Sequence, residues 1–139
     1  MIAGWELVDH AADIGVRAWG VTQSDVFEQA AFALFSLVCD PRDVDERESL
    51  EISLTADSPE QLLPAWLNEL LTTFEVRGLV LRQFEVLEVN ERSLRARVSG
   101  EPMDGSRHIL CGGVKAATRQ DVRLEPREGG WQGFVVLQM

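Results

Sequence analysis

The sequence predicts an α+β protein of two layers, in which two amphipathic helices pack on a mostly antiparallel sheet of about seven strands. Two segments repeat their apolar residues with the period of a helix, and several others alternate apolar and polar residues as strands do. Short turn sequences separate consecutive strand segments in the second half of the chain, which is typical of antiparallel hairpins. At 139 residues, 45% of them apolar, the chain is expected to fold as one domain, residues 1–139, with its own core.

The first elements expected are two short strands, at residues 5–8 and 14–19. In the second strand Ile14 and Val16 alternate with more exposed positions, a period of two. The segment between the strands, residues 9–13, reads Asp-His-Ala-Ala-Asp and is expected to be a loop. Two carboxylates and an imidazole in so short a loop repel or crowd one another unless a cation or a proton offsets the charge. The cluster is therefore a candidate metal site, a candidate catalytic site or a strained turn.

Two helices are expected: the first is capped by Thr22 or Ser24 and has its apolar face at residues 26–38, and the second spans residues 59–77. Ser58 can cap the second helix and Gly78 can end it. The first helix ends before Pro41, because the residue before a proline avoids helical geometry. The apolar faces consist of Val26, Phe27, Ala30, Ala31, Leu34, Phe35 and Val38 in the first helix, and of Leu62, Leu63, Trp66, Leu67, Leu70, Leu71 and Phe74 in the second.

The rest of the chain is expected to be mostly strand. The strands are expected at residues 50–56, 80–89, 93–99, 114–118, 122–126 and 131–137. A turn at residues 90–92 joins its two neighbours into a hairpin. Residues 42–49 are rich in charge and are expected to be a solvated loop.

The chain is acidic, with 23 Asp and Glu against 13 Lys and Arg and a net charge of −10. Such a surface repels phosphate backbones, so tight direct binding of nucleic acid is not expected. It suits a divalent cation or a basic protein partner, although an acidic surface also simply keeps a protein dissolved. No apolar run reaches the roughly 18 residues of a membrane span, and no signal peptide is visible, so a cytoplasmic location is expected.

The cysteines and histidines are few. Cys39 and Cys111 lie far apart and lack the spacing of a zinc site, so both are expected to be buried, reduced thiols. The two histidines are His10 and His108, and His108 is expected at the surface near a turn. Lys115, the only lysine, lies between apolar residues of a strand, where it can pair with a carboxylate of the cluster or extend into solvent.

Several segments occur in the order of the motifs of one known family. They are residues 7–20 (Leu-Val-Asp-His-Ala-Ala-Asp-Ile-Gly-Val-Arg-Ala-Trp-Gly), residues 30–35, the helix 62–71 with Trp66-Leu67-Asn68-Glu69-Leu70, Gly100-Glu101, His108, and residues 114–118 (Val-Lys-Ala-Ala-Thr). The first segment is specific to that family. Each later segment is weak evidence alone, but together they follow the family's order along the chain. On these residues the chain resembles the archease family along essentially its whole length.

The resemblance implies an accessory protein rather than an enzyme. Archeases assist the RNA ligase that joins a 2′,3′-cyclic phosphate or 3′-phosphate end to a 5′-hydroxyl end, as in tRNA splicing and RNA repair. They promote guanylylation of that ligase and its multiple turnover. The implied partner is therefore an RNA ligase protein.

The resemblance also implies a divalent-metal site, often occupied by calcium. Its ligands in the family are the second Asp of the first motif, an Asp just before the C-terminus and the terminal residue, which correspond to Asp13, Gln138 and Met139. The family usually ends in Asp-Ile, so Gln138 replaces a charged ligand by a neutral one. Calcium binding is therefore expected to be weakened, with the carboxylate of Met139 compensating in part. Asn68 also stands where the family often has Asp.

Asp9 and His10 can each be interpreted in two ways. Asp9 is a further ligand or a hydrogen-bond partner of His10, and His10 orients a neighbour or contacts the partner, since an all-oxygen calcium site needs no imidazole. An alternative function is a general interaction or chaperone module for tRNA-processing or tRNA-modifying enzymes, with a degenerate metal site. A metal-dependent hydrolase using the Asp/His cluster is disfavoured, because no second group of catalytic residues accompanies it.

Overall fold

A computed structural model describes residues 1–139, with two α-helices, one 3₁₀-helix and eight strands. The elements are β1 (Gly4–His10), β2 (Asp13–Gly20), α1 (Gln23–Ser36), η1 (Pro41–Asp43), β3 (Glu48–Thr55), α2 (Pro59–Arg77), β4 (Leu79–Val89), β5 (Ser93–Pro102), β6 (Ala116–Ala117), β7 (Arg123–Arg127) and β8 (Gly130–Gln138). The predicted α+β class is confirmed. The predicted single sheet of about seven strands is instead eight strands divided between two sheets.

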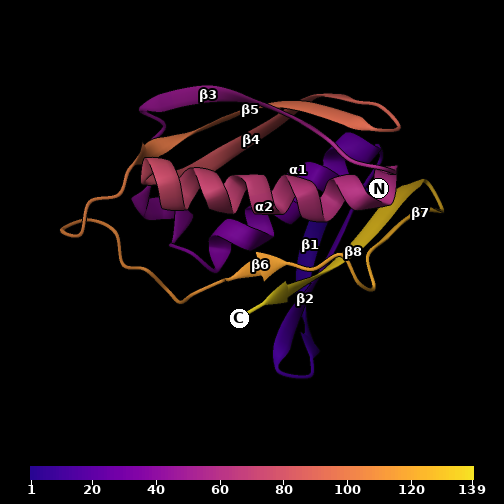
Figure 1. Ribbon diagram of the computed structural model, residues 1–139, viewed down its shortest axis with the longest axis horizontal. Coiled ribbons are helices and arrows are strands. Elements are labelled where there is room, and N and C mark those ends of the chain that lie inside the picture. Colours follow the sequence, from indigo (N-terminus) through magenta and orange to yellow (C-terminus); the bar gives the residue numbers. More distant parts are fainter.

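The two helices lie between the two sheets (Figure 1). Helix α1 packs against β4 on one side and against β1, β2 and β8 on the other, and α2 likewise contacts strands of both sheets. Each helix therefore buries two faces rather than the one face of the predicted two-layer arrangement. The buried apolar residues form a single cluster of 31 residues that runs through both sheets.

The first sheet has the strand order β1–β2–β8–β6, and β7 pairs with another part of β8. All its pairings are antiparallel. In the register of β2 and β8, Ile14 lies opposite Leu137 and Gly20 opposite Trp131. The last strand of the chain thus lies beside one of the first, and it ends where the β1–β2 turn begins.

The second sheet has the order β3–β5–β4 and is also antiparallel. The inward positions of its strands are apolar and buried, as in Ile52, Ala96 and Val98, whereas the positions between them face solvent. This alternation is the predicted period of two. Strands β3 and β4 are the two edges of this sheet.

Local signals position both helices. Thr22 and Asp25 form a capping box at the start of α1, and the Ser58 side chain accepts from the N–H of Gln61 at the start of α2. Gly78 ends α2 with a φ of 66°, in the left-handed region that favours glycine. Trp66 is fully buried, and its indole N–H donates to the carbonyl of Phe27 at 2.9 Å, which joins the two helices.

Three local expectations differ from the structure. Residues 9–13 form a tight hairpin and not a longer loop, and part of the charged connector is η1. Cys39 is buried as expected, whereas the expectation for Cys111 is wrong, because it lies exposed on the segment after β5.

None of the helices is both long and apolar enough to cross a membrane.

Candidate functional site

The Asp/His cluster lies at the tip of the β1–β2 hairpin. His10 pairs with Asp13 across a two-residue turn, and the first turn residue, Ala11, has a φ of 55°. Both turn residues are exposed, and Ala11 adopts the left-handed conformation of the turn although its Cβ disfavours it. Figure 1 shows this hairpin projecting beyond the end of β8. The structure therefore presents Asp9 and Asp13 on strand ends at a protruding point.

The end of the chain lies beside Asp13. The main-chain N–H of Met139 donates to Oδ1 of Asp13 at 3.4 Å, and Figure 1 shows the C-terminus next to the hairpin. On the opposite side of β8, Gln138 pairs with Ala116, and its carbonyl accepts from the N–H of Lys115 at 2.8 Å. Asp13, Gln138 and Met139 are thus brought together at one end of the first sheet.

Asn68 holds the neighbouring strand in place. Its side-chain oxygen accepts from the N–H of Ala117 at 2.8 Å, and its side-chain nitrogen donates to the carbonyl of the same residue at 3.0 Å. The amide therefore pairs with β6 as a strand residue would, and it attaches β6 to α2. An aspartate at this position accepts the N–H but has no hydrogen to donate to the carbonyl.

The side chain of His10 has other neighbours than that of Asp13 has, and none of its contacts is with the end of the chain. Its Nε2 lies 3.8 Å from Oδ2 of Asp121, and its ring lies 6.1 Å from that of Phe134. Asp121 is exposed and has a φ of 61°. Sequence reasoning missed Asp121, because no motif marks a single aspartate in a turn. Lys115 is exposed and forms no ion pair, so its pairing with a carboxylate of the cluster is absent from the structure.

The oxygen atoms at this end of the sheet are the ligand type that a hard cation prefers. The contact that the structure shows here joins Oδ1 of Asp13 to the N–H of Met139, and Gln138 lies at the same end of β8, paired with Ala116. No group of three or more His, Cys, Asp or Glu side chains gathers in the chain in a way that could hold a metal ion. Asp13 alone supplies a side-chain carboxylate here, so a divalent cation would also need the amide oxygen of Gln138 and main-chain oxygens as ligands.

A second group of charged residues surrounds one buried carboxylate, with Arg107 and Asp45 exposed. Glu101 is 1% exposed, and its carboxylate accepts from the N–H of Asp45 and pairs with the guanidinium of Arg107. These contacts, led by the main-chain N–H, hold the pKa of Glu101 below its ordinary value despite burial. The group fixes the segment after β5 to the segment after η1. It lies away from the C-terminal end and is a structural cluster.

His108 belongs to this cluster, and its expected surface position is wrong. It is 2% exposed, and its Nδ1 accepts from the N–H of Asp104 at 2.9 Å, which leaves the proton on Nε2. Nε2 has no hydrogen-bond partner and lies 3.7 Å from Oε2 of Glu101. Sequence reasoning missed the burial because the irregular segment that carries His108 has no periodic pattern to mark which side chains face inward.

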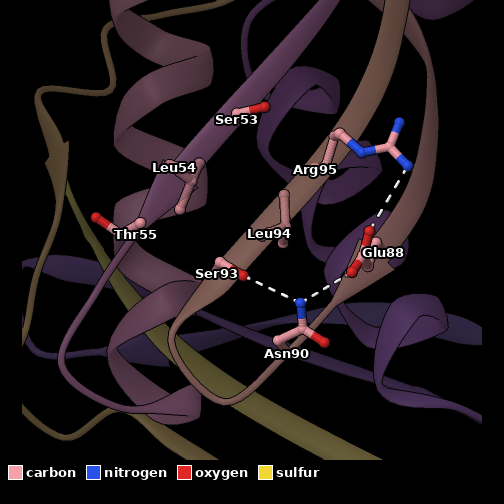
Figure 2. A pocket seen from close by; sticks show the side chains of 8 residues that line it. All are labelled: Ser53, Leu54, Thr55, Glu88, Asn90, Ser93, Leu94 and Arg95. Carbon is pink, nitrogen blue, oxygen red and sulfur yellow. Dashed lines mark hydrogen bonds and ion pairs between the residues drawn. The ribbon is translucent and has the colours of Figure 1, made fainter.

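The outer face of the second sheet holds a hollow of about 390 Å³ near the β4–β5 turn. Figure 2 shows that Glu88, Asn90, Ser93 and Arg95, on one side of the hollow, contact one another. Asn90 donates to Glu88 at 3.0 Å and to the hydroxyl of Ser93 at 3.2 Å, and Arg95 pairs with Glu88 at 3.6 Å. The hollow therefore offers a ligand few free polar groups, and the C-terminal end remains the candidate site.

Comparison with known proteins decides the family. A family model described as the Archease protein family matches residues 5–138 of the chain.

The chain belongs to the archease family. A protein named archease from Methanosarcina mazei is 37% identical, and the match covers 97% of this chain and 95% of that protein. The archease of Pyrococcus abyssi is 36% identical, with 95% of this chain and 96% of that protein covered. The solution structure of protein 1598 of Methanobacterium thermoautotrophicum has a TM-score of 0.82 and 27% identity, and it covers 98% of this chain and 99% of that one.

Family membership is thus confirmed over nearly the full chain, as the motif order predicted. The fold is shared with a solved structure of almost the same length. The ligand set and the partner protein stay predictions, because neither the names of the relatives nor the geometry identifies them.

Proposed function

We propose that this chain is an accessory protein that activates the RNA ligase joining 3′-phosphate or 2′,3′-cyclic phosphate ends to 5′-hydroxyl ends. In this role it promotes guanylylation of the ligase and its multiple turnover, in tRNA splicing or RNA repair. Membership of the archease family supports the accessory role. One structural observation supports the proposed site: the main chain of Met139 lies within hydrogen-bond distance of Asp13.

The proposed site takes a divalent cation, with calcium as the candidate. Asp13, Gln138 and Met139 would hold it through oxygen atoms. A bound cation would supply positive charge to offset phosphate charge at the ligase's nucleotide site. Gln138 is neutral, so this chain binds the ion less tightly than a relative with an aspartate at that position.

The projecting hairpin allows the proposed site to contact a partner protein. Ala11 and Ala12 are exposed and lack bulky side chains, so the tip is narrow enough to enter a concave surface. Asp9 is exposed on the same strand end, so the tip also carries acidic charge toward a basic surface. The proposed role of the chain's own residues is to place Asp13 and the C-terminal oxygens against the ligase.

The decisive experiment measures guanylylation of the cognate ligase, and RNA joining under multiple turnover, with and without this protein. We expect faster guanylylation and continued turnover with the protein present. The same assay with Asp13→Asn should lose most of the stimulation, whereas Glu75→Gln, on the exposed side of α2, should retain it. Equal rates with and without the protein would refute the proposal.

An alternative is a general interaction module for tRNA-processing or tRNA-modifying enzymes with a degenerate metal site. The neutral Gln138 and the lack of a group of three acidic or imidazole ligands favour it. Affinity capture separates the two proposals. Recovery of other enzymes but never of the ligase, together with no calcium binding, would support the alternative.

A further inference from the structure

Strand β3 has one open edge. It pairs with β5 only, and no strand lies on its other side, as Figure 2 also shows. The N–H of Ala56 donates to the carbonyl of Arg92, and in this register every second residue faces β5. Ile52 and Leu54 therefore direct their main-chain groups to β5, and Glu51, Ser53 and Thr55 direct theirs outward.

These outward groups have no partner in the protein. None of the hydrogen bonds outside the regular pairings uses the main chain of Glu51, Ser53 or Thr55. A row of unpaired N–H and C=O groups is the template to which another strand adds. The edge is eight residues long, so it can accept a segment of ordinary strand length.

Helix α2 runs beside this edge and forms the wall of a groove. The wall consists of Gln61, Ala65, Asn68, Thr72 and Val76, which recur at helical spacing along one side of the helix. These side chains are small or polar, unlike the large apolar residues that α2 buries in the core. The gap between α2 and β3 therefore stays open.

Two hollows follow the groove from end to end. The first, of about 370 Å³, lies between residues 50–53 of β3 and the C-terminal half of α2. The second, of about 320 Å³, lies between residues 55–57 and the N-terminal half of α2. Each is large enough to take side chains of an added strand, whose alternate residues point to the same face. Exposed Val76, at 78%, adds an apolar contact at one end.

The net charge of the whole chain favours a basic occupant, whereas the groove itself carries two free carboxylates and two arginines. Glu69 lies at the middle of the groove and Asp57 in its second half, and neither forms an ion pair. Arg77 lies where α2 ends, and Arg119, in the second hollow, is hydrogen-bonded to Gln61 at 3.2 Å. The chain as a whole has a net charge of −10, which attracts a cationic segment.

We propose that a basic, extended segment of a partner protein adds to β3 as a fourth strand and lies in the groove against α2. Main-chain hydrogen bonds to Glu51, Ser53 and Thr55 hold the segment, and its lysine or arginine side chains reach Glu69 and Asp57. This is strand addition in a strand–helix groove. The strand edge belongs to the second sheet and Asp13 to the first, so the inference does not depend on the proposed ligase function.

The test uses the full-length protein labelled with ¹⁵N and a synthetic octapeptide that alternates lysine and valine. We expect the amide signals of Glu51, Ser53 and Thr55 to shift on titration and their hydrogen exchange to slow. The same peptide with N-methyl groups on alternate residues cannot pair with an edge, so it should bind at least about tenfold more weakly. A glutamate–valine peptide should also bind more weakly.

Variants of the protein test both parts of the groove. Ser53→Pro removes an outward N–H at an edge, where proline is tolerated, and should weaken binding by about tenfold or more. Glu69→Arg should weaken binding about threefold to tenfold, whereas the matched variant Glu75→Arg, on the exposed side of the same helix, should not change it. If Ser53→Pro does not fold, the N-methylated peptide and the Glu69→Arg variant still test whether a strand binds at this edge.

Three outcomes would overturn the inference. The first is absence of shifts at Glu51, Ser53 and Thr55 at millimolar peptide. The second is equal binding of the N-methylated peptide. The third is protection of these amides that rises with protein concentration without peptide, which would make a second copy of this chain the occupant.

Discussion

The side-chain amide of Asn68 makes two hydrogen bonds to the main chain of Ala117, at 2.8 Å and 3.0 Å. The two residues are 49 positions apart, so this contact belongs to the tertiary structure alone. It attaches the two-residue strand β6 to helix α2. Because β6 pairs with the last residues of β8, Asn68 helps to determine where Gln138 lies.

Replacing Asn68 by alanine should destabilise the protein by about 1–3 kcal/mol, since it leaves both main-chain groups of Ala117 without these partners. Urea unfolding followed by tryptophan fluorescence measures the change. Gln83→Ala, at an exposed position of β4 with no side-chain hydrogen bond, should change stability by less than about 0.5 kcal/mol. Equal effects of the two substitutions would contradict the role assigned to Asn68.

Calcium binding should respond oppositely to two substitutions at the C-terminal end. Asp13→Asn removes the only side-chain carboxylate of the proposed ligand set and should abolish binding measured by calorimetry. Gln138→Asp adds a charged ligand and should tighten binding by roughly tenfold. Unchanged binding in both variants would exclude Asp13 and Gln138 as ligands, while leaving the strand pairing intact.

Two glycines should respond differently to alanine. A Cβ on Gly100 would collide with the carbonyl oxygen of Val80, whereas a Cβ on Gly105 would meet nothing within 4 Å. Gly100→Ala should therefore cost about 1–3 kcal/mol or more of the free energy of unfolding. Gly105→Ala should cost little or slightly stabilise the chain, because alanine restricts the unfolded state. Chemical unfolding of both variants checks the difference.

Acid should weaken the fold partly through Glu101. Contacts to the N–H of Asp45 and to Arg107 lower its pKa in the folded state, so the folded form binds fewer protons than the unfolded form. This contribution is complete above the ordinary glutamate pKa of about 4.3 and is lost as the pH falls through the lowered value. Glu101→Gln should therefore show a flatter dependence of stability on pH in the acid range than the parent protein. An identical pH profile of the two proteins, measured by urea unfolding, would contradict this assignment.

The helices and most strands could be predicted because their signals are local. Ser58 and Gly78 bound α2 at the predicted positions, and the alternation of Ile52 with its exposed neighbours identifies β3. The division into two sheets has no such signal. An apolar helix face looks the same in sequence whether it covers one sheet or lies between two.

The sequence by itself determined the α+β class, the boundaries of α2 and the family, because periodicity, caps and motif order are properties of neighbouring residues. It also identified Asp13 as a candidate within its own motif. The tertiary structure alone decided that Met139 lies beside Asp13 and that His108 is buried against Glu101. The first contact depends on which strands pair and in which register, which is set by burial of the common core and not by a local preference. The second depends on how the irregular segment after β5 folds back onto that strand.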